Sequence, residues 1–283
     1  MVGDYAILGE HDGSAEAESE MYETYETLLT ERRGKILTVT MNRPEVKNAA
    51  NDVMHAELAR IFYDIAADPD CDVVVLTGAG DAFCAGGDIN GMARKIEDHS
   101  LWVQTVVEAR DIFYGMLDLD KPVIARLNGA ASGLGATLAV YCDIIIAAES
   151  ARIGDPHVKV GLVAGDGGAL MWPMLVGYAK AKELLFLGDH VDAREAERIG
   201  LINYAVPDDQ LDEKVYAMAD RLAAGATQAI GWTKRAINHS LRQLAQGTME
   251  VGLGLETLSH LSHDHAEAVK AFREKRRPAF TGR

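Results

Sequence analysis

The sequence predicts an α/β fold with a mostly parallel sheet, followed by a C-terminal region of helices. Short apolar stretches typical of buried strands alternate with helical patterns up to residue 207, an order typical of strand–helix–strand units. From Asp208 onward the patterns are helical only. Before the core, the acidic stretch "GEHDGSAEAESE" shows no periodicity. We therefore expect a mobile acidic tail at 1–24, an α/β core at 25–207 and a helical region at 208–283.

The first part of the core begins with a predicted hairpin. Arg33 and Gly34 supply the turn within "TLLTERRGKILTVTMNRP", and the residues after the turn alternate as a strand does. "NDVMHAELARIFYDIAADP" is an amphipathic helix that starts near Asn51 or Asp52 and ends before Pro69. "CDVVVLTGAG" is then a buried strand that runs into a glycine turn.

The alternation recurs along the rest of the core. Strands are expected in "KPVIARLNG", "DIIIAAES" and "LINYAVP", and helices in "SGLGATLAVYC", "GGALMWPMLVG", "AKAKELLFLG" and "AREAERIG". In the C-terminal region, helices are expected in "DQLDEKVYAMADRLAAG" and "ATQAIGWTKRAINHSLRQ", and the helical trend continues through "GTMEVGLGLETLSHLS". The chain ends in the basic stretch "VKAFREKRRPAFTGR".

Charge and cysteine content exclude several classes of protein. The formal net charge of −15 argues against a nucleic-acid partner, because binding to phosphates needs a basic surface. Three cysteines without CxxC spacing fit a reducing cytoplasm better than a secreted chain held by disulfides. No apolar run approaches the roughly 20 residues of a membrane helix, and the acidic N-terminus does not resemble a signal peptide. We expect a cytoplasmic location without membrane contact.

The common phosphate and nucleophile motifs are missing. The glycines at 133 and 135 are followed by Leu138, where a dinucleotide fingerprint needs glycine or alanine, and no P-loop or GxSxG elbow occurs. His260, His263 and His265 lie close together in "HLSHDH". A solvated helix face is the commoner explanation for such a cluster, so we expect no metal site.

Three segments carry a specific resemblance: "NRPEVKNAA" at 42–50, "AFCAGGDI" at 82–89, and "NGAASGLGATLAVYCDIIIAAESARIG" at 128–154. In this order they resemble the crotonase superfamily, the enoyl-CoA hydratases and isomerases, and the similarity runs from about Tyr25 to the C-terminus. The resemblance implies a ββα spiral core. It also implies a homotrimer, or a dimer of trimers, formed through the C-terminal helices.

The resemblance implies an oxyanion hole made by the backbone amides of Gly87 and Leu134. Glycine turns leave backbone N–H groups uncovered, and a helix start offers free donors, so both loops suit a thioester oxygen that gains negative charge. Two tight turns without a ligand are the alternative. The resemblance implies an acyl-CoA substrate. We expect no separate cofactor, because coenzyme A is part of that substrate. The residues implied for binding it are Glu45, Val46, Lys47, Ala85, Asp88, Ile89, Lys275 and Phe280.

One departure from the family pattern bears on the reaction. Hydratases of the family use two glutamates, and those positions are Thr137 and His157 here. His157 is a candidate general base because histidine titrates near neutral pH, and Asp166, nine residues later, is expected to hold its other ring nitrogen. This pair, with Glu256, resembles a branch that cleaves a carbon–carbon bond in β-diketones by a retro-Claisen reaction.

Structural roles are the alternative for each of these residues. His157 would be a loop histidine, Asp166 the N-cap of the helix before "GGALMW", and Glu256 an exposed helix residue. Three functions therefore remain open. The first is acyl-CoA chemistry with His157 in place of a glutamate. The second is hydrolysis of a carbon–carbon bond in a β-dicarbonyl compound or β-ketoacyl-CoA, and the third is binding of acyl-CoA without turnover. Cys84, beside the first oxyanion turn, is expected to be a buried apolar residue.

Overall fold

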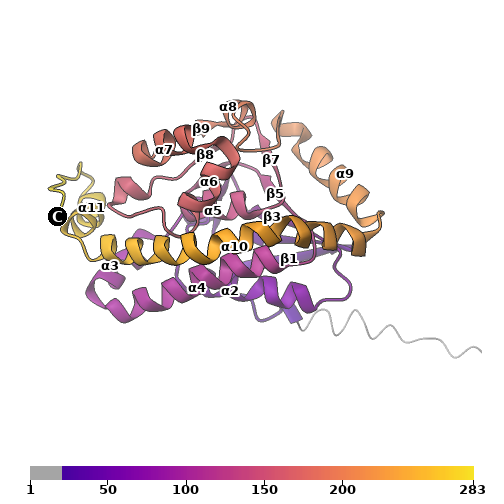
Figure 1. Ribbon diagram of the computed structural model, residues 1–283, viewed down its shortest axis with the longest axis horizontal. Coiled ribbons are helices and arrows are strands. Elements are labelled where there is room, and N and C mark those ends of the chain that lie inside the picture. Colours follow the sequence, from indigo (N-terminus) through magenta and orange to yellow (C-terminus); the bar gives the residue numbers. More distant parts are fainter. Residues whose placement is uncertain (1–20) are drawn as a thin grey trace, which may run out of the picture.

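The computed structural model describes residues 21–283 (Figure 1). Most of the predicted acidic tail, residues 1–20, therefore lies outside the described residues. Within the rest of that tail, Tyr22 is buried and its hydroxyl donates to Asp68 at 2.9 Å. Packing against the core thus begins inside the segment that the sequence assigned to the tail.

The larger sheet has six strands in the order β1-β2-β3-β5-β7-β10. The predicted hairpin forms β1 and β2, which pair antiparallel, and every other neighbouring pair in this sheet is parallel, as predicted. β3 is buried along its whole length, as expected for a parallel strand with both faces covered. The strands span Leu28–Arg33, Ile36–Met41, Val73–Gly78, Val123–Leu127, Ile144–Ala148 and Tyr204–Val206.

A second sheet has four short strands in the order β4-β6-β8-β9. β4, β6 and β8 run parallel to one another, and β9 pairs antiparallel with β8. Each long strand from β3 to β7 is followed in the chain by one of these short strands, so each repeat gives one strand to each sheet. This alternation is the ββα spiral expected from the resemblance. The short strands span Ala82–Cys84, Ala130–Ser132, Arg152–Gly154 and Val191–Asp192.

Helices cover the two sheets and form the C-terminal region. α9 packs against four strands of the larger sheet, and α10 crosses the width of the molecule beside α4 (Figure 1). The α-helices are α2 Asp52–Ala67, α3 Ile89–Glu97, α4 His99–Asp118, α5 Leu134–Tyr141, α6 Gly168–Val176, α7 Tyr178–Leu187, α8 Ala193–Arg198, α9 Leu211–Ala223, α10 Thr227–His260 and α11 His263–Arg273. The 3₁₀ helices are η1 Pro44–Val46, η2 His157–Val160 and η3 Asp208–Gln210.

Two parts of the helical layer differ from the sequence analysis. The predicted helix at 226–243 and the helical trend after it form one continuous α10 of 34 residues. The segment between β4 and β5 had no predicted structure, yet it forms α3 and the 20-residue α4. α4 packs closely on α2. Its helical form depends on this tertiary packing more than on a strong sequence signal.

The side chain of Asn48 ties the loop after β2 to the loop after β3. Asn48 is fully buried in a left-handed conformation (φ 57°), which asparagine tolerates better than most residues. Its Oδ1 accepts from the Arg43 N–H at 2.9 Å. Its Nδ2 donates to the carbonyl oxygens of Ala79, Ala82 and Phe83 at 2.8, 2.9 and 3.2 Å. This one amide therefore fixes the approach to the turn that follows β4.

We predict that Asn48→Asp destabilises the protein by about 3 kcal/mol, because a carboxylate cannot donate to three buried carbonyl oxygens. Chemical denaturation measures this loss of unfolding free energy. The matched control is Asn90→Asp, which changes an exposed asparagine. Equal stability of the two variants would contradict the role assigned to Asn48.

Candidate active site

The candidate site lies where the three parallel strands of the smaller sheet end. Gly86 and Gly87 follow β4, Gly133 and Leu134 follow β6, and Asp155 follows β8. Carboxyl ends of parallel strands meet at one edge of a sheet, where open α/β folds commonly place their sites. Segments far apart in sequence are brought together there.

The amides of Gly87 and Leu134 are free to bind a ligand. Leu134 is the first residue of α5, and helix starts leave their N–H groups without intrahelical partners. In the described part of the chain, neither N–H donates to another residue. The turn that holds Gly87 is fixed instead by its neighbours: Ala50 N–H donates to Gly86 O at 2.8 Å, and Asp88 N–H donates to Ala50 O at 2.9 Å.

The two turns touch through glycine backbones. Gly86 (φ 98°) and Gly133 (φ 53°) both have conformations that favour glycine. A Cβ at Gly86 would lie 2.9 Å from Ser132 O, so a side chain there would push the turns apart. A Cβ at Gly133 would lie 4.0 Å from His157 Cε1. The imidazole therefore lies directly beside the second turn.

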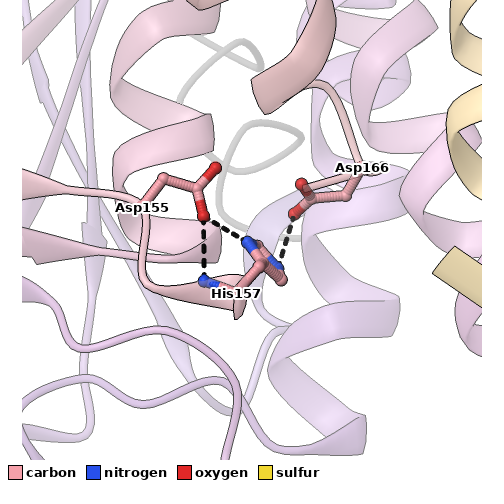
Figure 2. A group of neighbouring side chains, drawn as sticks. All are labelled: Asp155, His157 and Asp166. Carbon is pink, nitrogen blue, oxygen red and sulfur yellow. Dashed lines mark hydrogen bonds and ion pairs between the residues drawn. The ribbon is translucent and has the colours of Figure 1, made fainter. Parts of the chain in front are cut away.

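Asp155, rather than Asp166, holds the Nδ1 side of His157 (Figure 2). The Asp155 Oδ1 is hydrogen-bonded to Nδ1 and also accepts from the His157 N–H at 3.2 Å. Asp166 Oδ2 lies 3.8 Å from Nε2, an ion-pair distance that is too long for a hydrogen bond. The expected His157–Asp166 hydrogen bond is therefore corrected. A carboxylate two residues before a histidine can form a hydrogen bond with its ring, and this spacing is visible in the sequence as Asp155 and His157.

Asp166 is held by the residue at a glutamate position of the family pattern. Thr137 Oγ1 donates to Asp166 Oδ1 at 3.3 Å, and the Tyr141 hydroxyl donates to the Asp166 backbone oxygen. Asp166 is buried, and the N-cap of α6 is Gly167. The alternative of Asp166 as a helix cap is therefore wrong.

Glu256 reaches the site from α10, 99 residues after His157 (256 − 157). The alternative of an exposed Glu256 is wrong, since it is buried. The loop that carries Asp166 passes very close to α10, because a Cβ at Gly165 would lie only 2.2 Å from Gly252 O. Two glycines at this crossing bring Glu256 and Asp166 to the same cavity.

Burial and mutual repulsion set the charges of these groups. Burial alone would lower the pKa of His157, but the carboxylates of Asp155 and Asp166 outweigh it and hold that pKa well above its ordinary value. Burial raises the pKa of Asp166, and the nearby imidazole only partly offsets this. Burial and repulsion by Asp166 raise the pKa of Glu256 well above its ordinary value. Burial and repulsion thus both favour the protonated form of Glu256.

A cavity of about 520 Å³ joins these parts. It is lined by His157, Asp166, Glu256, and the two turns with Gly87 and Leu134, and also by Val46, Ala85, Asp88 and Ile89 of the residues implied for coenzyme A binding. Glu45, Lys47, Lys275 and Phe280 are not among its lining residues in this chain. Of the segment between β4 and β5, Asn90, Met92, Lys95, Trp102, Thr105, Val106 and Ala109 form part of its wall.

The histidine cluster near the C-terminus is not a solvated face. His260 and His265 are both buried, and His260 stacks on Trp102 with ring centroids 4.0 Å apart. Burial lowers the pKa of His260 to about 4. The interpretation from sequence is therefore wrong for these two residues, because His260 packs on α4 and the Nδ1 of His265 lies 2.7 Å from Val160 O of η2. Cys84 is buried as expected, and burial raises its pKa to about 11.

Within residues 21–283, one cluster of side chains holds three possible metal-ligand atoms close to one another. Asp155, His157 and Asp166 each offer an atom within 4.8 Å of the others. One Asp155 oxygen and Nδ1 already bind each other. The absence of a metal site stays a prediction.

Comparison with known proteins decides the family. The family profile described as enoyl-CoA hydratase/isomerase matches residues 31–283.

The chain belongs to the enoyl-CoA hydratase/isomerase family of enzymes.

The alignments with curated relatives span about nine-tenths of this chain. The 1,2-epoxyphenylacetyl-CoA isomerase of Escherichia coli is 36% identical over 263 residues, covering 91% of this chain and 99% of the relative. The 2,3-dehydroadipyl-CoA hydratase of the same organism is 33% identical over 261 residues, covering 90% and 99%.

Solved structures of the family share the fold. An enoyl-CoA hydratase/isomerase from Mycobacterium paratuberculosis has a TM-score of 0.83 at 35% identity, covering 86% of this chain and 97% of its own. A β-diketone hydrolase from the cyanobacterium Anabaena, bound to (S)-3-oxocyclohexyl acetic acid, has a TM-score of 0.80 at 31% identity with the same coverage. Within the described residues of this family member, no helix has the length and apolar character needed to cross a membrane.

We predict that Asp166→Asn lowers the pKa of His157, because it removes one of the negative charges that stabilise the imidazolium. NMR titration of the His157 ring protons measures this shift directly, and Asp209→Asn, an exposed site, is the control. A His157 pKa that stays unchanged in Asp166→Asn would contradict the assigned electrostatics.

Proposed function

We propose that this enzyme acts on an acyl-CoA thioester through an enolate, with His157 in place of the family glutamates. The observation that carries the proposal is the pair of His157 with the buried Asp155, which lies beside two free amides at one end of the smaller sheet. No cofactor is needed beyond the coenzyme A of the substrate. The names of the two Escherichia coli relatives, both of which act on CoA thioesters, support the substrate class.

The geometry gives each group a role. The thioester oxygen lies against the amides of Gly87 and Leu134, and each well-placed donor lowers the barrier by roughly 3 kcal/mol. Asp155 keeps a proton on Nδ1 of His157. In the form of the enzyme with no proton on Nε2, this nitrogen takes the proton from water as the hydroxide adds to the double bond. Because the pKa of His157 is raised, the share of this form increases as the pH rises. Glu256, whose pKa is raised, returns a proton to the carbon of the enolate. His157 then releases its proton and Glu256 takes up a proton in exchange, so both groups return to their starting forms.

The assembly is part of the proposal. We propose that Lys275 and Phe280 reach the coenzyme A of a neighbouring subunit in a homotrimer or dimer of trimers, and that Glu45 and Lys47 lie along the coenzyme in its own subunit. Exposed apolar side chains support an assembly: Tyr178 and Phe186 on α7, and Ile237, Val251 and Leu258 on α10. The three free, buried cysteines fit the proposed cytoplasmic location.

A second candidate function is hydrolysis of a carbon–carbon bond in a β-diketone or β-ketoacyl-CoA. In this reaction His157 activates water for attack on a carbonyl carbon, the adjacent carbon–carbon bond breaks, and the enolate formed is protonated by Glu256. The placement of Asp166 and Glu256 in the same cavity as His157 favours this candidate. The similarity to the Anabaena β-diketone hydrolase supports it as well. Binding without turnover is the least supported of the three functions, because it leaves the buried ion pair without a use.

We predict that His157→Ala lowers turnover by about 10²–10⁴-fold while the fold and thioester binding are retained, because only the proton-transfer group is lost. Mass spectrometry of products separates the candidates, with a short enoyl-CoA and a cyclic β-diketone as substrates. A hydrated thioester that is lost in His157→Ala supports the first function, and a keto acid from the diketone supports the second. His239→Ala, at an exposed histidine on α10, is the control. Undiminished turnover in His157→Ala would overturn both.

A further inference from the structure

A second histidine–carboxylate pair borders the same cavity. His55 on α2 is buried, and its Nδ1 lies 2.6 Å from Glu108 Oε2 on α4. Gln104 Nε2 donates to the other oxygen of Glu108 at 2.9 Å. Burial would raise the pKa of Glu108, but these hydrogen bonds outweigh it and hold that pKa below its ordinary value. The ionised carboxylate therefore keeps a proton on His55 Nδ1.

The other ring nitrogen, Nε2, has no partner within residues 21–283. Only Nδ1 of His55 takes part in a side-chain hydrogen bond there. Some buried polar atoms in this part of the chain are fully enclosed and have no hydrogen-bond partner, but Nε2 of His55 is not one of them. Since His55 lines the cavity, its Nε2 is accessible to a ligand there. A ring fixed at one nitrogen presents the second nitrogen to a ligand in one orientation.

The backbone fixes His55 relative to the oxyanion turn. The His55 N–H donates to Asn51 O at 2.9 Å, in the first turn of α2, and Ala50 just before it forms a bridge with Gly87. His55 therefore lies one helical turn from the segment paired with the oxyanion loop. A thioester held at Gly87 would therefore lie in the same cavity as His55.

The surroundings of Nε2 restrict its partner. The wall formed by α4 and α10 is apolar there, with Trp102, Val106, Ala109 and Leu253. The ammonium of Lys95 is already paired with Asp52 at 3.1 Å. A carboxylate on the substrate would meet the carboxyl groups of Asp166 and Glu256 in the same cavity. An unsubstituted alkyl chain would cover Nε2 and leave it without a hydrogen bond.

We propose that the acyl group of the substrate carries a hydroxyl group, which is bound by His55 Nε2. A hydroxyl can donate to this nitrogen when the imidazole is neutral and accept from it when the imidazole is charged, and it adds no charge to the cavity. This inference rests on the proposed acyl-CoA function and names the substrate class within it. Glu108 acts as the positioning residue for His55.

Binding of non-reacting thioesters tests the inference apart from the reaction. Isothermal titration calorimetry compares a saturated acyl-CoA with matched acyl-CoAs that carry one hydroxyl group, moved carbon by carbon along the chain from C4 onward, because a hydroxyl at C3 is the product of the proposed hydration. We predict that one hydroxylated thioester binds at least about 10-fold more tightly than the plain one, as expected when a buried polar group gains its partner. His55→Leu should lose this preference. His239→Leu, which removes an exposed histidine from α10, should keep it.

A double variant covers the risk that Glu108, partly buried and without its His55 partner, unfolds the protein. His55→Leu combined with Glu108→Leu removes both partners, which costs far less stability than removing one. A hydroxyl preference that persists in this folded double variant, or that is absent from the wild type at every position, overturns the inference but leaves acyl-CoA binding intact. No binding of any thioester overturns the proposed acyl-CoA function, and this inference with it.

Discussion

The parallel pairing of the three short strands β4, β6 and β8 is the constraint on which the site depends. Each strand is only three residues long, yet the pairing aligns their carboxyl ends, so that two free amides and a histidine emerge side by side. The close approach of Gly86 to Ser132 shows how little room the arrangement leaves. The buried amide of Asn48 then holds the first of these strands to the larger sheet. The geometry of the candidate site therefore depends on backbone pairing before any side chain contributes.

The second constraint is electrostatic. Three carboxyl groups and one imidazole share a buried site, and all of them cannot be charged at low energetic cost. Asp155 and His157 neutralise each other, and Thr137 donates to Asp166. Glu256 is left with burial and repulsion that both favour its protonated form. In the proposed mechanism His157 supplies the base and Glu256 the acid, so two different residue types share the proton transfers.

The sequence predicted the larger elements and a set of candidate residues that the structure brings to one cavity, because glycine turns, alternating strands and the family segments leave local signals. His157, Asp166, Glu256, Gly87 and Leu134 all line one cavity. The partner of the imidazole was predicted wrongly, because which carboxylate reaches Nδ1 depends on how the chain turns after β8 and not on spacing alone. α4 and the pair of His55 with Glu108 were not predicted at all. His55 and Glu108 lie on different helices and are 53 positions apart in the sequence, so no local sequence pattern predicts their contact.

The C-terminal region has a larger part in the site than its predicted role in assembly suggests. Glu256 enters the cavity only because α10 passes the loop of Asp166 at Gly165 and Gly252, where backbone meets backbone. A side chain at either glycine would move the helix and the acid away together. Trp102 of α4, whose indole N–H donates to Thr257 at 3.1 Å, ties the α4 wall of the cavity to the same helix. The helix that carries Glu256 therefore also supports the α4 wall, so a change in one of these two parts of the cavity is transmitted to the other through α10.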